Sequence, residues 1–337
     1  MGRRRINPED NKLPKRVRSN GYSYVFKPHG STKTIGLGKI KETTIAQVWA
    51  NYERLMAELS TTLTFSQLWN YFLDSAYFSE LKPRTQKDYL QHQKKLLAVF
   101  GKVSVNSIKP EHVRTFMDKR GLQSKTQANH EMASMSRVYR WGYERGYAKG
   151  NPCVGVSKFT LKARDNYITD EQYQAIYQAA APALQCGMEI AYLCAARIGD
   201  VLSLRWDQVL EEGIYIQQGK TGVKQIKIWS NRLLLAVESA KNLNDTVYVI
   251  STQNGNKYSY NGFNDLWNKA KIAASKRLGI TLSCTFHDLK AKGISDYEGS
   301  TRDKQLFSGH KTESQVLSYD RKVKLSPTLD KPILKEE

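Results

Sequence analysis

The sequence predicts a multidomain α+β protein. The chain has 337 residues, which is too long for one hydrophobic core of ordinary size. Apolar residues recur at helical spacing over most of the length, whereas strand-like runs occur only near residues 21–37 and 213–229. A basic stretch at residues 158–164 separates two apolar regions. We therefore expect a small N-terminal sheet with one helix, then a four-helix domain, then a mixed but mainly helical domain.

Residues 1–60 predict a small N-terminal unit. Residues 1–20 are basic and show no apolar period, so we expect them to be disordered in the free protein. Gly21–Phe26 alternates as a strand does, and Thr32–Leu37 returns as a second strand after a turn. Apolar residues at helical spacing from Ile45 to Leu59 predict one helix across this sheet. A unit of about sixty residues lies near the lower limit for independent folding, which favours an added binding module.

A second domain, with four helices, is expected at residues 62–160. The first helix starts at Thr64, because Thr64 and Gln67 form a capping-box pattern ahead of an apolar run. Two further helices begin with proline, which is favoured in the first helical turn, and a third begins with a serine cap. The expected ranges of the other helices are Pro83–Phe100, Pro110–Arg120 and Ser124–Gly146.

The last domain is expected at residues 166–337, after a linker that contains Asn151-Pro152 and the basic stretch Lys158–Arg164. Tyr167–Gln172 starts a helix, because it offers a threonine cap and two acidic residues in the first turn. Pro182–Ala195 is apolar nearly all round and is therefore expected to be buried. Two strands complete the domain, at Gly213–Gln217 and Gln225–Trp229.

The charge balance indicates a polyanionic partner. Fifty-two Lys and Arg residues against 32 Asp and Glu give a net charge of +20, with a pI near 9.6. This excess favours nucleic acid over an ordinary basic protein. The candidate DNA-binding residues are the cations of the N-terminal arm and those on the polar faces of the helical domain. They are Arg3, Arg4, Arg5, Arg16, Arg18, Lys94, Lys95 and Lys125.

The cysteines and the hydropathy exclude several classes of protein. The four cysteines form no CxxC pair, and no histidine lies at zinc-ligand spacing from them, so we expect small core residues and no metal site. Free thiols of this kind are typical of a reducing compartment, and we expect a cytoplasmic protein. No run of 18 apolar residues occurs, so we expect no membrane span.

Arg197 and Lys220 are the first two candidates for chemistry. Arg197 follows the buried helix, and its guanidinium offers a planar, permanently charged fork for phosphate oxygens. Asp200 follows three residues later and can orient Arg197 or a neighbour; alone, the two residues would be a structural ion pair. Lys220 lies at the tip of the predicted hairpin, where its ammonium can reach a ligand and protonate a leaving oxygen. An exposed lysine in a turn is usually inert.

The remaining candidates lie near the C-terminus. His287 and Lys290 are three residues apart, on one face of a helix, and both can donate to a phosphate. The pair Gly309-His310 is predicted to form a turn that opens a short helix, which leaves Tyr319 at or beyond the end of that helix. A tyrosine hydroxyl is a poor nucleophile until cations surround its target, because its ordinary pKa lies near 10.

These residues occur in a recognisable order along the chain: Arg197, Lys220, His287, Lys290, His310 and Tyr319. The order resembles the tyrosine recombinases, and the lambda-type phage integrases in particular. The family pattern is Arg, Lys, His-x-x-Arg, a second His or Trp, and then the nucleophilic Tyr. Each of these motifs is weak evidence alone, but five motifs in the right order over about 120 residues are a specific signal. The nine-residue separation of the second His and the Tyr also matches.

The resemblance extends over the whole chain and carries roles with it. It implies an arm-binding domain at residues 1–60, with a three-stranded sheet although the residues themselves indicate two strands. It further implies a core-binding domain at residues 62–160 and a catalytic domain at residues 166–337. The implied roles are phosphate clamp for Arg197, general acid for Lys220, acid-base and phosphate contact for His287, phosphate contact for Lys290, donor to the scissile phosphate for His310 and nucleophile for Tyr319.

The implied reaction is site-specific recombination of double-stranded DNA through a 3′-phosphotyrosine, in integration and excision. It needs neither ATP nor metal, so no cofactor is expected, because the covalent bond conserves the phosphoester energy. The implied partners are core and arm attachment sites, a homotetramer on DNA, a host DNA-bending protein and an excisionase.

One position departs from the family pattern. The family usually has Arg where this chain has Lys290, and Lys lacks the bidentate fork. Two other interpretations therefore stay open. One is a type IB topoisomerase or resolvase, which shares the chemistry, and the other is a DNA-binding protein with impaired catalysis.

Overall fold

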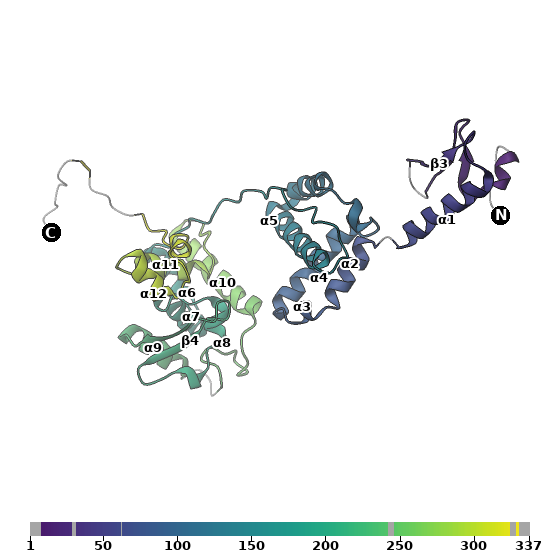
Figure 1. The fold of residues 1–337 in the computed structure, drawn as a ribbon. Coiled ribbons are helices and arrows are strands. Elements are labelled where there is room, and N and C mark those ends of the chain that lie inside the picture. The colour runs from purple at the N-terminus through teal and green to yellow at the C-terminus, as the bar shows by residue number, and fades with distance from the viewer. Residues whose placement is uncertain (1–7, 29–31, 62, 242–245, 324–327, 330–337) are drawn as a thin grey trace. The chain divides into compact units, whose positions relative to one another are not determined.

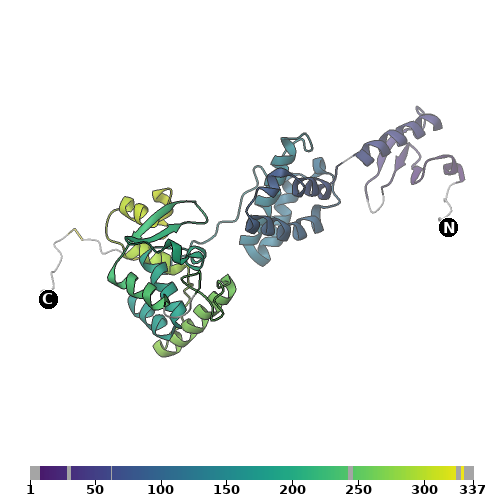
Figure 2. The same cartoon turned by 90° about the horizontal axis from the view of Figure 1, so that it is seen from below.

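The computed structural model describes residues 8–28, 32–61, 63–241, 246–323 and 328–329. The chain divides into two compact units, Met1–Leu161 and Lys162–Glu337. The first unit contains two separate hydrophobic cores, one in the N-terminal part and one among the following helices. Figures 1 and 2 show the elements of each unit from two directions.

The N-terminal part is a three-stranded antiparallel sheet with one helix. The strands are β1 (Val17–Ser19), β2 (Ser23–Phe26) and β3 (Ile35–Lys39), in that spatial order. Helix α1 (Ile45–Thr61) packs against β3 (Figure 1). The helix and the sheet were expected from the apolar pattern, and the third strand that the resemblance implied is β1. The buried core residues here are Leu13, Val17, Phe26, Leu37 and Val48.

The expectation that residues 1–20 are disordered is wrong for residues 8–20. The 3₁₀ helix η1 (Pro8–Lys12) precedes β1, and Leu13 between them is buried. The indole Nε1 of Trp49 donates to the Lys12 carbonyl at 2.9 Å, which ties this segment to α1. Two buried apolar residues and this hydrogen bond are enough to fix the segment, although they form no period in the sequence. The candidate cations Arg3, Arg4 and Arg5 lie outside the described residues.

The next helices form the second core. They are α2 (Phe65–Leu73), α3 (Ala76–Ser79), α4 (Pro83–Phe100), the 3₁₀ helix η2 (Val105–Ser107) and α5 (Pro110–Tyr143). Helix α5 contains a non-helical residue at Ser124 (φ −162°, ψ 106°), so it consists of two helices, as the sequence predicts. The capping box of Thr64 and Gln67 is present at the start of α2. The one-turn helix α3 and the 3₁₀ helix η2 were not expected.

The aromatic residues of α2 lie at the centre of this core. Phe65 and Trp69 are fully buried, and Phe65 stacks on Tyr139 of α5 with the ring centroids 5.5 Å apart. Tyr139 in turn donates to the Val105 carbonyl at 3.0 Å. The candidate DNA-binding cations that the structure describes are all exposed to solvent: Arg16, Arg18, Lys94, Lys95 and Lys125.

The second unit is mainly helical with one hairpin. Its helices are α6 (Asp170–Ala179), α7 (Pro182–Leu193), α8 (Ile198–Ser203), η3 (Trp206–Gln208), α9 (Asn231–Lys241), α10 (Tyr260–Leu278), α11 (Asp288–Asp296), α12 (Thr301–Ser308) and α13 (Glu313–Leu317). Strands β4 (Gly213–Gln217) and β5 (Lys224–Ile228) pair antiparallel. As predicted, α7 is largely buried, and it packs against α9 and α11. Strand β5 lies beside α12, since Gln225 and Lys227 both donate to carbonyls at the end of that helix (Figure 2).

Two glycines allow close packing around α11 and α12. A Cβ on Gly293 of α11 would lie 2.1 Å from the carbonyl oxygen of Tyr192, so the backbones of α11 and α7 touch there. Gly309 ends α12 in the left-handed region (φ 65°), and a Cβ there would meet the side chains of Gln218 and Gln225. Both positions require glycine, the first for space and the second for space and conformation.

We expect Gly293→Ala to destabilise the protein by about 1–3 kcal/mol, because the new methyl group must push two helices apart. Chemical denaturation, followed through the unfolding transition of the second unit, measures this change in the free energy of unfolding. The matched control is Gly199→Ala, also in a helix, where a Cβ meets nothing within 4 Å and stability should be unchanged or slightly raised. Equal stability of the two variants would contradict the close contact of α7 and α11.

Candidate active site

Arg197 lies in the short turn between α7 and α8, directly before Ile198 begins α8. The turn contains Ala195 with φ 48°, a left-handed conformation that is uncommon for a residue with a side chain. The Ala195 carbonyl accepts a hydrogen bond from Lys290 Nζ at 2.5 Å. Lys290 of α11 therefore holds the strained turn in place, and Arg197 lies two residues after Ala195 in that turn.

Gln218 joins Arg197 to two other elements and was not expected from the sequence. Its buried side chain accepts from Arg197 Nη1 at 2.5 Å and donates to the Ser308 carbonyl at 2.9 Å. Thr221 Oγ1 also donates to it, at 2.9 Å. Gln218 thus connects the α7–α8 turn, the hairpin and the end of α12. Its position two residues before Lys220 was the only signal in the sequence.

Lys220 is exposed at the tip of the β4–β5 hairpin, as predicted. In the part of the chain that the structure describes, its ammonium forms no hydrogen bond or ion pair. The hairpin tip is held by Asp200 Oδ1, which accepts from the backbone N–H of Gly219 at 2.8 Å. Asp200 therefore positions the hairpin that carries Lys220. It forms no ion pair with Arg197 in the described part of the chain.

Helix α11 carries His287 at its N-terminal boundary and Lys290 one turn later. Lys290 is only 1% exposed, and in the described residues it forms no ion pair with a carboxylate. Burial, together with the nearby charges of Arg197 and Lys227, lowers the pKa of Lys290 to about 7. Its ammonium lies 5.9 Å from the ring centroid of Tyr319. A lysine held in this way carries its charge only near or below neutral pH, unless an anion binds beside it.

His310 follows Gly309 and is 6% exposed. Its Nδ1 is within 2.7 Å of Ser308 Oγ, whereas its buried Nε2 has no hydrogen-bond partner among the described residues. Burial lowers the pKa of His310 to about 4, and the charges of Lys290 and Arg197 add to the effect. An imidazole nitrogen that is buried and unpartnered is costly, so it points to a ligand oxygen at this position.

Tyr319 lies two residues beyond α13, as the sequence predicts. Its hydroxyl is 3.2 Å from Nε2 of His287, and its ring centroid is 4.9 Å from that of His310. Burial lowers the pKa of His287, and Lys290 and Arg197 lower it further although Asp288 raises it. His287 is therefore neutral at pH 7 and can accept a proton from the tyrosine hydroxyl.

The structure thus brings five predicted residues into one site, while Lys220 remains on the adjoining hairpin. The five are Arg197, His287, Lys290, His310 and Tyr319. The lowered pKa values of the two histidines and the lysine share one cause, which is desolvation beside other cations. A site of this kind favours an anion with several oxygens, and its tyrosine hydroxyl can act as a nucleophile on that anion.

Comparisons with known proteins agree with this arrangement. A family model described as "Phage integrase family" matches residues 166–324. A second, described as "Phage integrase, N-terminal SAM-like domain", matches residues 64–120. The chain belongs to the phage integrase family. It is accordingly a tyrosine-type site-specific recombinase by family.

Relatives with this fold match nearly the whole chain. The integrase of Escherichia phage HK022 is 24% identical over 95% of this chain and 96% of its own length. The integrase of Escherichia phage lambda is 23% identical, with the same coverage. Among solved structures, a lambda integrase dimer bound to a COC′ core site aligns with a TM-score of 0.71 and 20% identity. That alignment covers 98% of this chain and 100% of the other.

The structure also bears on metal ligands, cysteines and membrane spans in the described part of the chain. No group of three or more His, Cys, Asp or Glu residues there is placed to hold a metal ion. The four cysteines are buried and free, and burial raises the thiol pKa of Cys284 to about 11, in agreement with a core role. Within the described ranges, no helix is long and apolar enough to span a membrane.

Further residues around the site were missed by the sequence reasoning. Lys227 of β5 donates to the Phe307 carbonyl, and its ammonium lies 4.8 Å from the Phe307 ring centroid. Arg321, two residues after Tyr319, donates at 2.7 Å to Oδ1 of Asp288, the residue that follows His287. A basic residue in a chain with an excess of cations gives no sign of being buried, so the sequence offered no signal for either.

We expect the second-order rate constant of DNA cleavage to fall as pH rises from 7 to 9 in the wild-type protein. Lys290 loses its proton over this range, whereas His287 and His310 are already neutral. Lys290→Arg should remove the fall, because guanidinium stays charged. The check is a pH profile of single-turnover cleavage at subsaturating protein.

The matched control for this profile is Lys269→Arg, an exposed position on α10, which should keep the wild-type pH dependence. Parallel profiles for wild type and Lys290→Arg would show that the charge of Lys290 does not limit the reaction between pH 7 and 9.

Proposed function

We propose that this chain cuts and rejoins double-stranded DNA at attachment sites through a 3′-phosphotyrosine on Tyr319. The observation that carries the proposal is the contact of the Tyr319 hydroxyl with His287 Nε2, at 3.2 Å, beside the buried Lys290. Arg197 adds a donor to the same site, and Nε2 of His310 has no hydrogen-bond partner among the described residues. The arrangement supplies a nucleophile, a base and phosphate contacts.

The chemistry follows from these groups. Tyr319 attacks the scissile phosphorus and passes its proton to neutral His287, and the 5′-oxygen leaves. Negative charge gathers on the nonbridging oxygens in the pentacoordinate transition state, where Arg197, Lys290 and His310 stabilise it. Lys220 would protonate the leaving 5′-oxygen; its side chain is exposed at the tip of the hairpin that Asp200 holds. The reverse reaction joins another 5′-hydroxyl strand without ATP or metal.

Different parts of the chain would bind different DNA sites. The helices at residues 62–160 and the catalytic domain at residues 166–337 would bind core sites, with Lys94, Lys95 and Lys125 among the contacts. Residues 1–60 would bind arm sites, with Arg16 and Arg18 exposed there. The net charge of +20 supports DNA as the partner, because each neutralised phosphate releases a counterion.

The assembly is proposed from relatives. Lambda integrase structures are described as a dimer bound to a core site and a tetramer bound to a Holliday junction. We infer that four copies of this chain act on two duplexes in the host cytoplasm. A host DNA-bending protein and an excisionase would assist integration and excision.

The two alternatives are less well supported. A type IB topoisomerase or resolvase shares the chemistry, but the curated relatives named above are integrases that match 95% of this chain, including its N-terminal unit. A DNA-binding protein with impaired catalysis was suggested by Lys290. The ammonium of Lys290 nevertheless lies within the site, between the Ala195 carbonyl and the ring of Tyr319, where it can still meet a phosphate.

Covalent trapping tests the proposed function. We expect the wild-type protein to form a denaturant-resistant adduct with nicked attachment-site DNA, and Tyr319→Phe to form none. The DNA sequence is first obtained by sequencing the junctions that flank the gene in its host. An adduct in both proteins would assign another nucleophile. Tight DNA binding without any adduct would favour the impaired DNA-binding protein.

The role of Lys220 can be tested with a leaving group that needs no proton. Lys220→Ala should slow cleavage of ordinary DNA on the order of 10²–10³-fold, as expected for loss of a general acid. When sulfur replaces the bridging 5′-oxygen, the thiolate leaves unaided, and the variant should cleave nearly as fast as wild type. Lys224→Ala, exposed on the same hairpin, is the control for both substrates. A slow reaction of Lys220→Ala on the sulfur substrate would exclude the general-acid role.

A further inference from the structure

The residues directly after Tyr319 form ion pairs with two other elements. Asp320 Oδ2 is 3.1 Å from Lys304 Nζ of α12. Arg321 Nη1 is 2.7 Å from Asp288 Oδ1 of α11. Two oppositely charged residues directly after the nucleophile are thus fixed to α12 and α11.

Both ion pairs are buried. The side chains of Lys304 and Asp320 are 7% and 6% exposed. Those of Arg321 and Asp288 are 9% and 1% exposed. Lys304 also donates to the Ser295 carbonyl at 3.1 Å, and Arg321 donates to the Asn166 carbonyl at 3.0 Å. The cations are therefore held by several acceptors in fixed geometry, unlike exposed pairs, whose side chains move freely.

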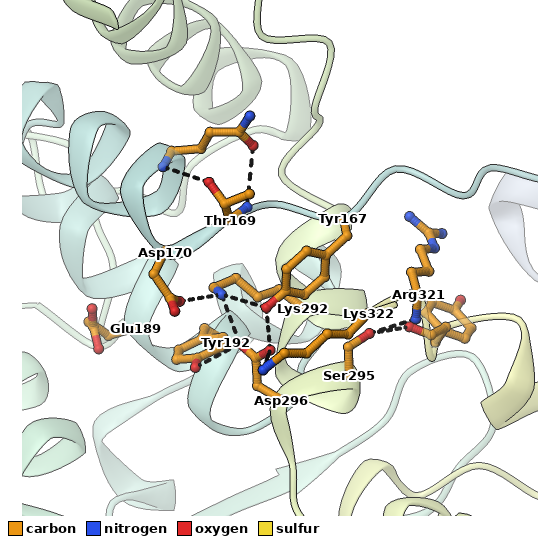
Figure 3. Close-up of polar contacts among 12 residues, drawn as sticks. Tyr167, Thr169, Asp170, Glu189, Tyr192, Lys292, Ser295, Asp296, Arg321 and Lys322 are labelled. Atoms are coloured by element: carbon orange, nitrogen blue, oxygen red, sulfur yellow. Dashed lines mark hydrogen bonds and ion pairs between the residues drawn. The ribbon is translucent and has the colours of Figure 1, made fainter. Parts of the chain in front are cut away.

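The backbone around the nucleophile is fastened to α11 as well. Ser295 Oγ donates to the Tyr319 carbonyl at 3.0 Å and accepts from the Arg321 N–H at 2.7 Å. Figure 3 shows Ser295 next to Arg321, with Lys292 and Asp296 on the same helix. Helix α11 also begins directly after His287, whose Nε2 meets the Tyr319 hydroxyl. One helix therefore fixes the backbone of the nucleophile and the group that accepts its proton.

Stability alone does not account for these pairs. Desolvation of two buried charges offsets most of their attraction, so buried ion pairs often add little to the free energy of folding. What such pairs supply is geometry, because only one arrangement satisfies both partners. Here the geometry that they fix is that of the residue on which the proposed cleavage depends.

We propose that the ion pairs Lys304–Asp320 and Arg321–Asp288 are a clamp that holds the Tyr319 hydroxyl against His287 before DNA binds. The four residues are positioning residues, since none of them touches the reacting atoms. This inference rests on the proposed function and adds the means by which the nucleophile is placed.

The clamp is tested by opening each ion pair in a separate variant. Lys304→Met/Asp320→Leu replaces the first pair by apolar side chains of similar size, which proteins usually tolerate. Arg321→Met opens the second pair, while Asp288 keeps its hydrogen bonds from Thr285. The control is Arg302→Met, also on α12, where the replaced arginine is exposed and forms no ion pair in the described part of the chain.

Two reactions separate positioning of Tyr319 from damage to the site. The first is single-turnover cleavage of nicked attachment-site DNA, which requires Tyr319. The second is ligation by proteins that also carry Tyr319→Phe. Its substrate is a DNA strand ending in 3′-p-nitrophenyl phosphate. The 5′-hydroxyl of the second strand attacks phosphorus and nitrophenolate leaves, so the phosphate contacts are used without the nucleophile.

We expect the clamp variants to cleave about 10²-fold more slowly than wild type, at unchanged DNA affinity, because a shift of about 1 Å in a reacting group has such an effect. Their ligation rates should equal that of Tyr319→Phe alone, and Arg302→Met should match wild type in cleavage. Wild-type cleavage rates in the clamp variants would overturn the inference. An equal loss of ligation would do so too, since it would indicate a merely structural role. If wild type forms no adduct and Tyr319→Phe does not ligate, the proposed function itself fails.

Discussion

The hydrogen bond from Lys290 to the Ala195 carbonyl is the interaction on which the site depends. It joins α11 to the turn between α7 and α8, and it does so next to Arg197. The same helices touch at Gly293, where no side chain would fit. Because α11 also places His287 and, through Ser295, the backbone of Tyr319, one rigid contact between two helices sets the distances among most of the reactive groups.

Two buried lysines on α11 show how environment separates structural from chemical roles. Lys292 contacts Asp170 and Asp296 at 2.6 and 2.8 Å, as Figure 3 shows, and is 1% exposed. Burial lowers the pKa of Lys292, but these two carboxylates outweigh it and raise the pKa. Lys290 is equally buried and forms no ion pair in the described residues, so its pKa falls. Lys292 has its counterions within the fold, whereas Lys290 has none among the described residues.

The sequence predicted the elements more fully than their contacts. Helix caps such as Thr64, and the apolar pattern of α7, are local features, and the structure agrees with them. The ordered segment at residues 8–20 was missed because its stability comes from contacts with α1 that are distant in sequence. Gln218 was missed for the same reason, since its amide acts only once three elements meet. Motif order predicted the site residues, but only the fold shows which of them are buried and lack a partner among the described residues.

The replacement of the usual Arg by Lys290 changes how charge enters the proposed site. Arginine would stay charged in the free protein, beside Arg197 and without a paired carboxylate. Lysine can instead release its proton, and the lowered pKa values of Lys290, His287 and His310 all favour the neutral forms of these side chains. A bound phosphodiester would raise the pKa of Lys290 again, because an adjacent negative charge favours the ammonium form. On the proposed function, the substrate itself would then complete the set of charges that stabilises its transition state.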